Sequence, residues 1–139
     1  MICNAIDLIK DHEGYREAVY NDSLGYPTGG YGHAFLPGSK LPGHIWELIL
    51  IDDLAEAGQN FKQLGLDLDD VRRAACLDLL FNLGLTKLLK FKTFIKHMRA
   101  GDYDAAAAAL ENSLWYQQVA RRGPRICALI RTGQWEAIT

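Results

Sequence analysis

The sequence predicts an α+β fold that is mostly helical, with a small β-hairpin lobe and a helical lobe on either side of a cleft. From about residue 45 onward, apolar residues recur at helical spacing in segment after segment. Residues 14–35, by contrast, mix aromatic and β-branched residues with glycine and proline, as short strands and turns do. A chain of 139 residues is long enough for one domain with a substantial core.

The front of the chain is expected to contain a helix and then a hairpin. The first helix has an apolar face formed by Ile2, Ile6, Leu8 and Ile9, and it should end near His12 because Gly14 follows Glu13. Residues 14–35 should form a hairpin or three short strands, with a turn over residues 21–25. The small lobe is expected to span about residues 12–60.

The remainder of the chain is expected to be helical. After a loop bracketed by two Pro-Gly pairs, residues 45–61 form a helix, and a second begins at Val71 behind Asp69 or Asp70 as its cap. That second helix is apolar nearly all round, so it should run through the core and end at Gly84. Further helices are expected at 91–99, 103–112, 113–120 and 123–131, with a last turn at 134–138. The helical lobe, about residues 61–139, would be completed by helix 1–11.

Composition and charge exclude several classes of protein. A net charge of −2 argues against a nucleic-acid binder. The charge is uneven, since residues 1–70 carry four Lys/Arg against twelve Asp/Glu, and residues 71–139 carry eleven against five. The two halves could attract each other across a cleft, the basic half could face an anionic polymer, or both could simply be solvated surfaces.

Cysteine usage and hydropathy bear on the compartment. Three cysteines without CxxC spacing suggest neither a disulfide framework nor a zinc site, so we expect buried or semi-buried thiols in a reducing cytoplasm. No apolar run approaches 18 residues, so no membrane span is expected. The start lacks a basic region before its apolar stretch, so we expect no secretory signal.

Two carboxylates and a hydroxyl are the candidates for chemistry. Glu13 lies where the first helix gives way to glycine, Asp22 lies in the hairpin turn, and Thr28 follows on the returning strand. Two carboxylates around one groove are what hydrolysis of a glycosidic bond requires. Tyr26 and Tyr31 could stack on a sugar. The alternative interpretation is structural: a helix-end junction at Glu13 and an Asx-turn at Asp22.

The spacing of these residues matches a known pattern. Glu13-Gly14, Asp22, Thr28 and Gly32-His33 follow the order E-G-x7-D-x5-T-x3-G-H, which resembles the phage-type lysozymes, glycoside hydrolase family 24. The resemblance spans nearly the whole chain, because further segments follow in the family's order: Asp-Leu-Ala-Glu at 53–56, VRRAACLDLLFNLG at 71–84, GDYDAAA at 101–107, SLWYQQ-x2-RR at 113–122 and RTGQW at 131–135.

The resemblance implies a role for each matching residue. Glu13 would be the general acid, Asp22 the second carboxylate, and Thr28 the hydroxyl that helps to hold the attacking water. Arg122 would pair with Glu13, with Arg121 as the near alternative. The remaining assignments are a structural pair of His33 with Asp53, or with its rival Asp52, and substrate contacts from Tyr31, Phe81 and Asn82. Phe81 and Asn82 have equally good structural interpretations, as a core side chain and a helix-end amide, and the three tryptophans are expected to be core anchors.

The implied function is that of a muramidase in phage or prophage lysis. Such an enzyme cuts the β-1,4 bond between N-acetylmuramic acid and N-acetylglucosamine in peptidoglycan with no metal or cofactor, inverts the anomeric carbon, and is expected to work as a monomer. It would accumulate in the host cytoplasm until a holin opened the membrane, and then act on the cell wall. Two alternatives stay open: a lytic transglycosylase, which would need no positioned water, and a lysozyme-like module that binds glycan without cutting it.

Overall fold

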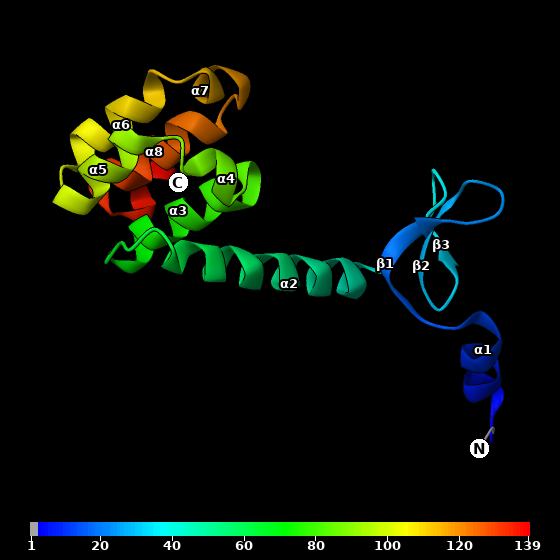
Figure 1. Ribbon diagram of the computed structural model, residues 1–139. Helices are drawn as coiled ribbons and strands as arrows, with labels where there is room; N and C mark the ends of the chain where they lie inside the picture. The colour runs from blue at the N-terminus through cyan, green and yellow to red at the C-terminus, as the bar shows by residue number, and fades with distance from the viewer. Residues whose placement is uncertain (1–2) are drawn as a thin grey trace. The chain divides into compact units, whose positions relative to one another are not determined.

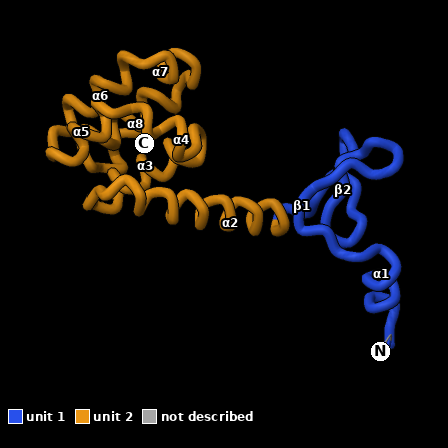
Figure 2. Tube along the Cα trace, in the orientation of Figure 1, with its two compact units in different colours: residues 1–43 blue, residues 44–139 orange. Residues whose placement is uncertain are grey.

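The computed structural model describes residues 3–139 as two compact units (Figure 2). The first comprises the described residues up to Gly43, and the second runs from His44 to Thr139. Ile2, one member of the expected apolar face, lies outside the described residues. Helices predominate and a small three-stranded sheet accompanies them, so the predicted α+β class is confirmed. The assignment of residues to two lobes, at about 12–60 and 61–139 with helix 1–11, stays a prediction.

The first unit consists of one helix and a three-stranded antiparallel sheet (Figure 1). Helix α1 spans Ala5–Glu13, and the strands β1 (Arg16–Asn21), β2 (Pro27–Gly30) and β3 (His33–Ala34) pair in the order β1-β2-β3. Helix α1 ends one residue later than predicted. Gly14 adopts a φ of 67° there and donates its N–H to the carbonyl of Lys10, as a helix-terminating glycine does.

The second unit is entirely helical in its regular structure. It begins with α2 (Gly43–Lys62) and α3 (Asp70–Leu83), and continues with α4 (Leu85–Leu88), α5 (Lys92–Ala100), α6 (Tyr103–Glu111), α7 (Leu114–Gln118), α8 (Arg122–Thr132) and the 3₁₀ helix η1 (Trp135–Ile138). Apart from the single turn α4, each of these segments was expected from the sequence. Within residues 3–139, no helix combines the length and hydropathy needed to cross a bilayer.

Helix α3 is the centre of the core. Asp69 caps its start by accepting the N–H of Arg72, and four of its residues are buried: Ala75, Cys76, Leu79 and Leu80. Helix α3 packs against α8, which in turn packs against α6 (Figure 1). Buried side chains of α5, α6 and α8 belong to the same core cluster, among them Phe94, Met98, Leu110 and Ile130. An apolar helix without one polar face was expected to be enclosed in this way.

Among the tryptophans and the cysteines, some residues are buried as expected and others are not. Trp115 is a core anchor as predicted, at 5% exposure, but Trp46 and Trp135 are about half exposed, so the prediction is wrong for those two. Cys76 and Cys127 are buried thiols, and burial raises their pKa values to about 12 and about 11. Cys3, in contrast, is exposed.

Arg72 joins the start of α3 to the end of α8. Its guanidinium donates to the carbonyls of Ile130, at 2.6 Å, and Arg131, at 3.0 Å, which belong to the last turn of α8. It also pairs with Asp69 at 2.8 Å and lies 3.7 Å from the ring centre of Tyr103. Burial works to raise the pKa of Asp69, but the backbone N–H and guanidinium of Arg72 outweigh it and hold that pKa below its usual range. A cation on otherwise unpaired terminal carbonyls stabilises a helix end.

We therefore expect Arg72→Met to destabilise the second unit. The substitution keeps most of the apolar stem but leaves two carbonyls of α8 without their donor, and hydrogen bonds from a charged group predict a loss of about 2–3 kcal/mol. Urea unfolding followed by circular dichroism measures it. The control is Arg73→Met, since Arg73 is exposed, and its effect should stay within about 0.5 kcal/mol. Equal losses for both variants would contradict the assigned role of Arg72.

Candidate active site

Glu13 is the last residue of α1, and its carboxylate rests against the backbone of Gly32. A Cβ atom built on Gly32 would overlap Oε2 of Glu13 and lie 2.9 Å from its carboxyl carbon. Gly32 also has a φ of 77°, a conformation that side chains other than glycine rarely adopt. The Glu-Gly and Gly-His parts of the sequence pattern therefore meet at one point of the first unit, and Gly32 leaves the space that the acid occupies.

Asp22 and Thr28 are linked through the backbone of Tyr26. Oδ1 of Asp22 accepts the N–H groups of Leu24 and Tyr26, each at 2.9 Å, while the Thr28 hydroxyl donates to the carbonyl of Tyr26 at 3.0 Å. The Asx-turn of the structural interpretation is thus present. The turn uses Oδ1 of Asp22, and the separate bond from Thr28 uses its hydroxyl hydrogen. Oδ2 of Asp22 and the hydroxyl lone pairs of Thr28 therefore remain for other partners. Thr28 is the buried polar residue of this unit, at 4% exposure.

The predicted aromatic contact residue Tyr31 lies beside Gly32. Its ring centre is 5.2 Å from that of Tyr15, and the ammonium group of Lys10 lies 5.3 Å from it. Tyr31 is 46% exposed and Tyr26 is 44% exposed, so part of each ring is open to a ligand. The Tyr15–Tyr31 pair is a contact that sequence reasoning did not identify, although Tyr15 follows Gly14 directly.

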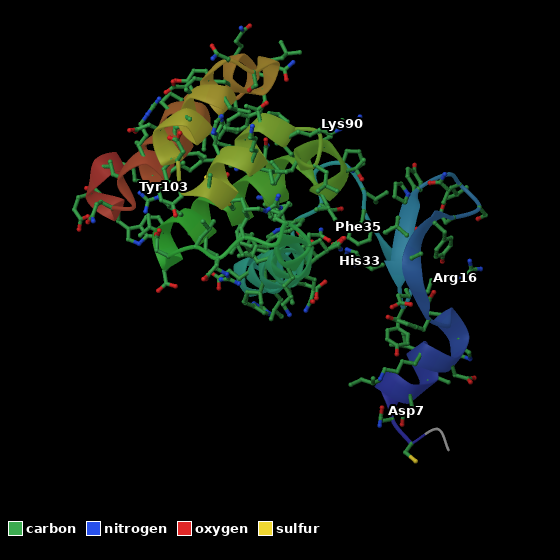
Figure 3. All side chains as sticks on the ribbon, turned by 60° about the vertical axis from the view of Figure 1, so that its left-hand side comes forward. Asp7, Arg16, His33, Phe35, Lys90 and Tyr103 are labelled. Atoms are coloured by element: carbon green, nitrogen blue, oxygen red, sulfur yellow. The ribbon has the colours of Figure 1, made fainter. Side chains whose placement is uncertain are left out.

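His33 begins β3, where it pairs with Gly29 of β2. Its imidazole packs edge-on against Phe35 at a centroid distance of 4.9 Å, and Figure 3 shows the two side chains next to each other. His33 is exposed, and its structural role stays a prediction. Asp53 lies on α2, where it lines a pocket of about 260 Å³ with Glu56 and Phe81. The pairing of His33 with Asp53, or with Asp52, stays a prediction.

Arg122 is the first residue of α8 and forms an ion pair within its own unit. Its Nε lies 3.0 Å from Oδ1 of Asp78 on α3. Arg122 is half-buried, whereas Arg121 before it is exposed. Both line a hollow of about 720 Å³ bounded by α3, α7, α8 and η1. The burial and the ion pair distinguish Arg122 from its rival as an organised side chain.

The last turn of α3 contains Phe81 and Asn82, which have different surroundings. Phe81 is 45% exposed, so the interpretation as a core side chain is wrong. Asn82 accepts a hydrogen bond at 2.8 Å from the indole N–H of Trp115, which fixes its amide and ties α3 to α7. The amide NH₂ of Asn82 keeps its two hydrogens for another acceptor. Their contact with substrate stays a prediction.

Comparisons with known proteins identify the family. The family model described as phage lysozyme matches residues 10–136. The chain belongs to the phage lysozyme family. It is 26% identical to "Probable T4-type lysozyme 1" of Dictyostelium discoideum, over 99% of both chains, and 24% identical to "Probable T4-type lysozyme 2" of the same organism, over 96% of both. It is also 27% identical to the pre-baseplate central spike protein of Enterobacteria phage T4, and there the match covers 94% of this chain but only 28% of the relative.

Family membership confirms the resemblance inferred from the sequence. Phage lysozymes are glycosidases of peptidoglycan, which supports the expected class of enzyme. Among residues 3–139, no three His, Cys, Asp or Glu side chains are grouped closely enough to hold a metal ion.

Asp78 lines the same hollow as Arg122, and sequence reasoning did not single it out. It is the one charged residue in the stretch AACLDLLFNLG, which runs through the core. A lone acid in an otherwise apolar helix body is the signal that could have drawn attention to it, and in the structure its side chain is 45% exposed.

We expect Gly32→Ala to displace the carboxylate of Glu13 in this phage lysozyme. The added methyl group would overlap Oε2, so the ¹³C resonance of the Glu13 carboxyl should shift. Gly30→Ala is the matched control, because Gly30 also has a positive φ, of 59°, but has open space where its Cβ would lie. Both variants should lose about 1 kcal/mol of stability through backbone strain. A Glu13 resonance that moves equally in both variants would contradict the close approach.

Proposed function

We propose that this chain is a muramidase that hydrolyses the β-1,4 bond between N-acetylmuramic acid and N-acetylglucosamine in bacterial peptidoglycan. One observation carries the proposal. In this member of the phage lysozyme family, the carboxylate of Glu13 lies against Gly32, and both Asp22 and Thr28 hydrogen-bond to the backbone of Tyr26. Two carboxylates and a hydroxyl are the groups that hydrolysis with a positioned water requires.

Glu13 would act as the general acid. Protonation of the glycosidic oxygen makes the departing sugar a better leaving group while positive charge develops on the other sugar ring. The end of α1 and the closeness of Gly32 restrict the directions in which the Glu13 side chain can point. A fixed acid can meet the leaving oxygen without first losing conformational freedom.

Asp22 and Thr28 would hold the attacking water. The Thr28 hydroxyl donates its hydrogen to the carbonyl of Tyr26, so it can only accept a hydrogen bond from a water. Oδ2 of Asp22 is an acceptor as well. A water that donates one hydrogen to each of these oxygens presents a lone pair to the sugar, and Asp22 can take up the proton that leaves as the bond forms. This is the inverting mechanism.

Other residues would support this chemistry. We assign Arg122, rather than Arg121, to the pairing with Glu13, because Arg122 is half-buried and its guanidinium is already held by Asp78. We assign Tyr31 to stacking on the glycan through its exposed ring. Phe81 and the free NH₂ of Asn82 would add apolar and hydrogen-bonding contacts, and His33 with Asp53 would stabilise the fold.

The proposed biological setting is lysis of a host cell by a phage or prophage. The enzyme would collect in the host cytoplasm, reach the wall after a holin had opened the membrane, and degrade peptidoglycan as a monomer without a metal or cofactor. The family of the chain supports this setting.

We expect Glu13→Gln to abolish cleavage of cell walls while the protein stays folded. The amide is nearly isosteric but cannot donate the proton, and general acid catalysis typically contributes about 10²–10⁴-fold in rate. The loss of turbidity of purified walls measures activity, and circular dichroism measures folding. Glu17→Gln, the same change at an exposed residue of β1, should leave the rate unchanged. Wild-type activity in Glu13→Gln would place the acid elsewhere.

Arg122→Ala should reduce turnover more than it reduces stability, and Arg121→Ala should do little to either. The reason is that Arg122 is proposed to orient Glu13, whereas Arg121 is exposed. Wall-clearing rates and urea unfolding of both variants provide the comparison. The opposite ranking would indicate that Arg121 is the partner of Glu13. Small and equal effects would indicate that the uneven charge of the two halves reflects surface composition alone.

A further inference from the structure

The loop between β1 and β2 determines how Asp22 and Thr28 lie relative to each other. The loop consists of residues 23–25, because Asp22 and Tyr26 on either side of it still pair: the N–H of Asp22 donates to the carbonyl of Tyr26 at 2.9 Å. The N–H of Gly25 donates to the carbonyl of Asp22, also at 2.9 Å, and closes a β-turn. A turn followed by a residue at positive φ is a common construction of three-residue hairpin loops.

Gly25 is the residue at positive φ in this loop. Its φ is 84°, and it is exposed. Apart from its chain neighbours, no heavy atom of residues 3–139 lies within 4 Å of the place where a Cβ atom on Gly25 would be. The left-handed conformation is costly for other residues because their Cβ atom approaches the following carbonyl oxygen. The position is therefore constrained by its backbone conformation and not by lack of space.

The backbone of Tyr26, which follows Gly25 directly, contacts both groups proposed to hold the water. Its N–H donates to Oδ1 of Asp22 at 2.9 Å, and its carbonyl accepts the hydroxyl of Thr28 at 3.0 Å. Thr28 is buried in β2, where it pairs with Tyr20 of β1. The peptide group that joins Gly25 to Tyr26 contains the N–H that binds Asp22. A rotation of the Gly25 backbone would therefore move the Asp22 carboxylate away from the Thr28 hydroxyl.

We propose that Gly25 is a positioning residue for the glycosidase reaction: its left-handed conformation sets the separation of Asp22 and Thr28 at which one water can donate a hydrogen bond to each. The proposal rests on the proposed function, in which these two residues hold the attacking water. Gly25 acts through the Tyr26 peptide group and not by contact with the glycan. A water held by only one of the two oxygens would not keep its lone pair directed at the sugar.

Loss of this positioning should lower turnover. The attacking water is not part of the glycan, so its misplacement should lower kcat and leave KM nearly unchanged. If the role of Gly25 were purely structural, a substitution would lower stability, and the enzyme that stayed folded would turn over at the normal rate.

Gly38 provides a matched control in the same unit. It too has a φ of 84°, is exposed and has open space where its Cβ would lie, and its turn is closed by a hydrogen bond of 2.9 Å from Ser39 to Leu36. Gly25→Ala and Gly38→Ala, each in the full chain, should therefore lose similar stability in urea unfolding.

The kinetic experiment compares these two variants on a soluble glycan fragment of peptidoglycan. Gly25→Ala should lower kcat about 10-fold, whereas Gly38→Ala should change it by less than about twofold. Gly25→Asn should recover most of the lost kcat, because Asn adopts positive φ more readily than Ala. Equal kcat values in the two alanine variants, or an Asn variant as slow as Gly25→Ala, would overturn the proposal.

Amide hydrogen exchange observes the same geometry without substrate. The Tyr26 N–H should exchange about 10-fold faster in Gly25→Ala than in the wild-type chain, and at the wild-type rate in Gly38→Ala. Unchanged exchange in Gly25→Ala would overturn the positioning role. A wild-type chain that cleaves no glycan would overturn the proposed function even if the exchange rates were as expected, so the two failures are distinguishable.

Discussion

The burial of helix α3 is the constraint on which the second unit depends. Its buried residues belong to one core cluster with side chains of α5, α6 and α8, and three of its polar residues are held by partners on α7 or α8. Arg72 at its start caps the end of α8, Asp78 in its middle pairs with Arg122, and Asn82 at its end binds Trp115. The helix that contributes to the core thus also holds Arg122 and Asn82, two residues proposed for the site.

In the first unit, contacts with the backbone, and not a buried core, fix the positions of the candidate catalytic side chains. α1 and β1 contain no buried residue, whereas β2 buries Thr28 and Gly29. The candidate catalytic groups are held instead by main-chain geometry: Glu13 by its approach to Gly32, and Asp22 and Thr28 by the N–H and carbonyl of Tyr26. A side chain that would disturb the approach of Glu13 is absent at Gly32.

Local signals in the sequence predicted most of the elements. Gly14 and Gly84 end α1 and α3 at positive φ, and Asp69, Asp102 and Ser113 cap the helices that follow them, all of which depends only on neighbouring residues. The single turn α4 was missed because no side chain caps it and it has too few residues to show a period. Trp46 and Trp135 were misjudged because a large apolar side chain does not report by itself whether another element covers it.

At the candidate site, too, local features could be predicted from the sequence and contacts between distant segments could not. The positions of Glu13, Asp22 and Thr28 were predicted because their spacing is a pattern in one short stretch, and the Asx-turn at Asp22 follows from the turn residues around it. The partner of Asp78 could not be predicted, because it depends on α3 packing against α8, which is distant in the sequence. Long-range pairs require the fold, whereas caps and turns do not.

The central claim is that Asp22 and Thr28 hold a water which attacks the sugar on the face opposite the acid Glu13. The most direct test is the configuration of the fresh reducing end, observed by ¹H NMR within the first minutes of digestion, before mutarotation mixes the anomers. An inverting mechanism on a β-linked glycan, with carboxyl groups about 6.5–9.5 Å apart, predicts the α anomer. A β product would indicate a carboxylate nucleophile at about 5–5.5 Å, and an anhydro sugar would indicate a transglycosylase with no attacking water; either result would contradict the claim.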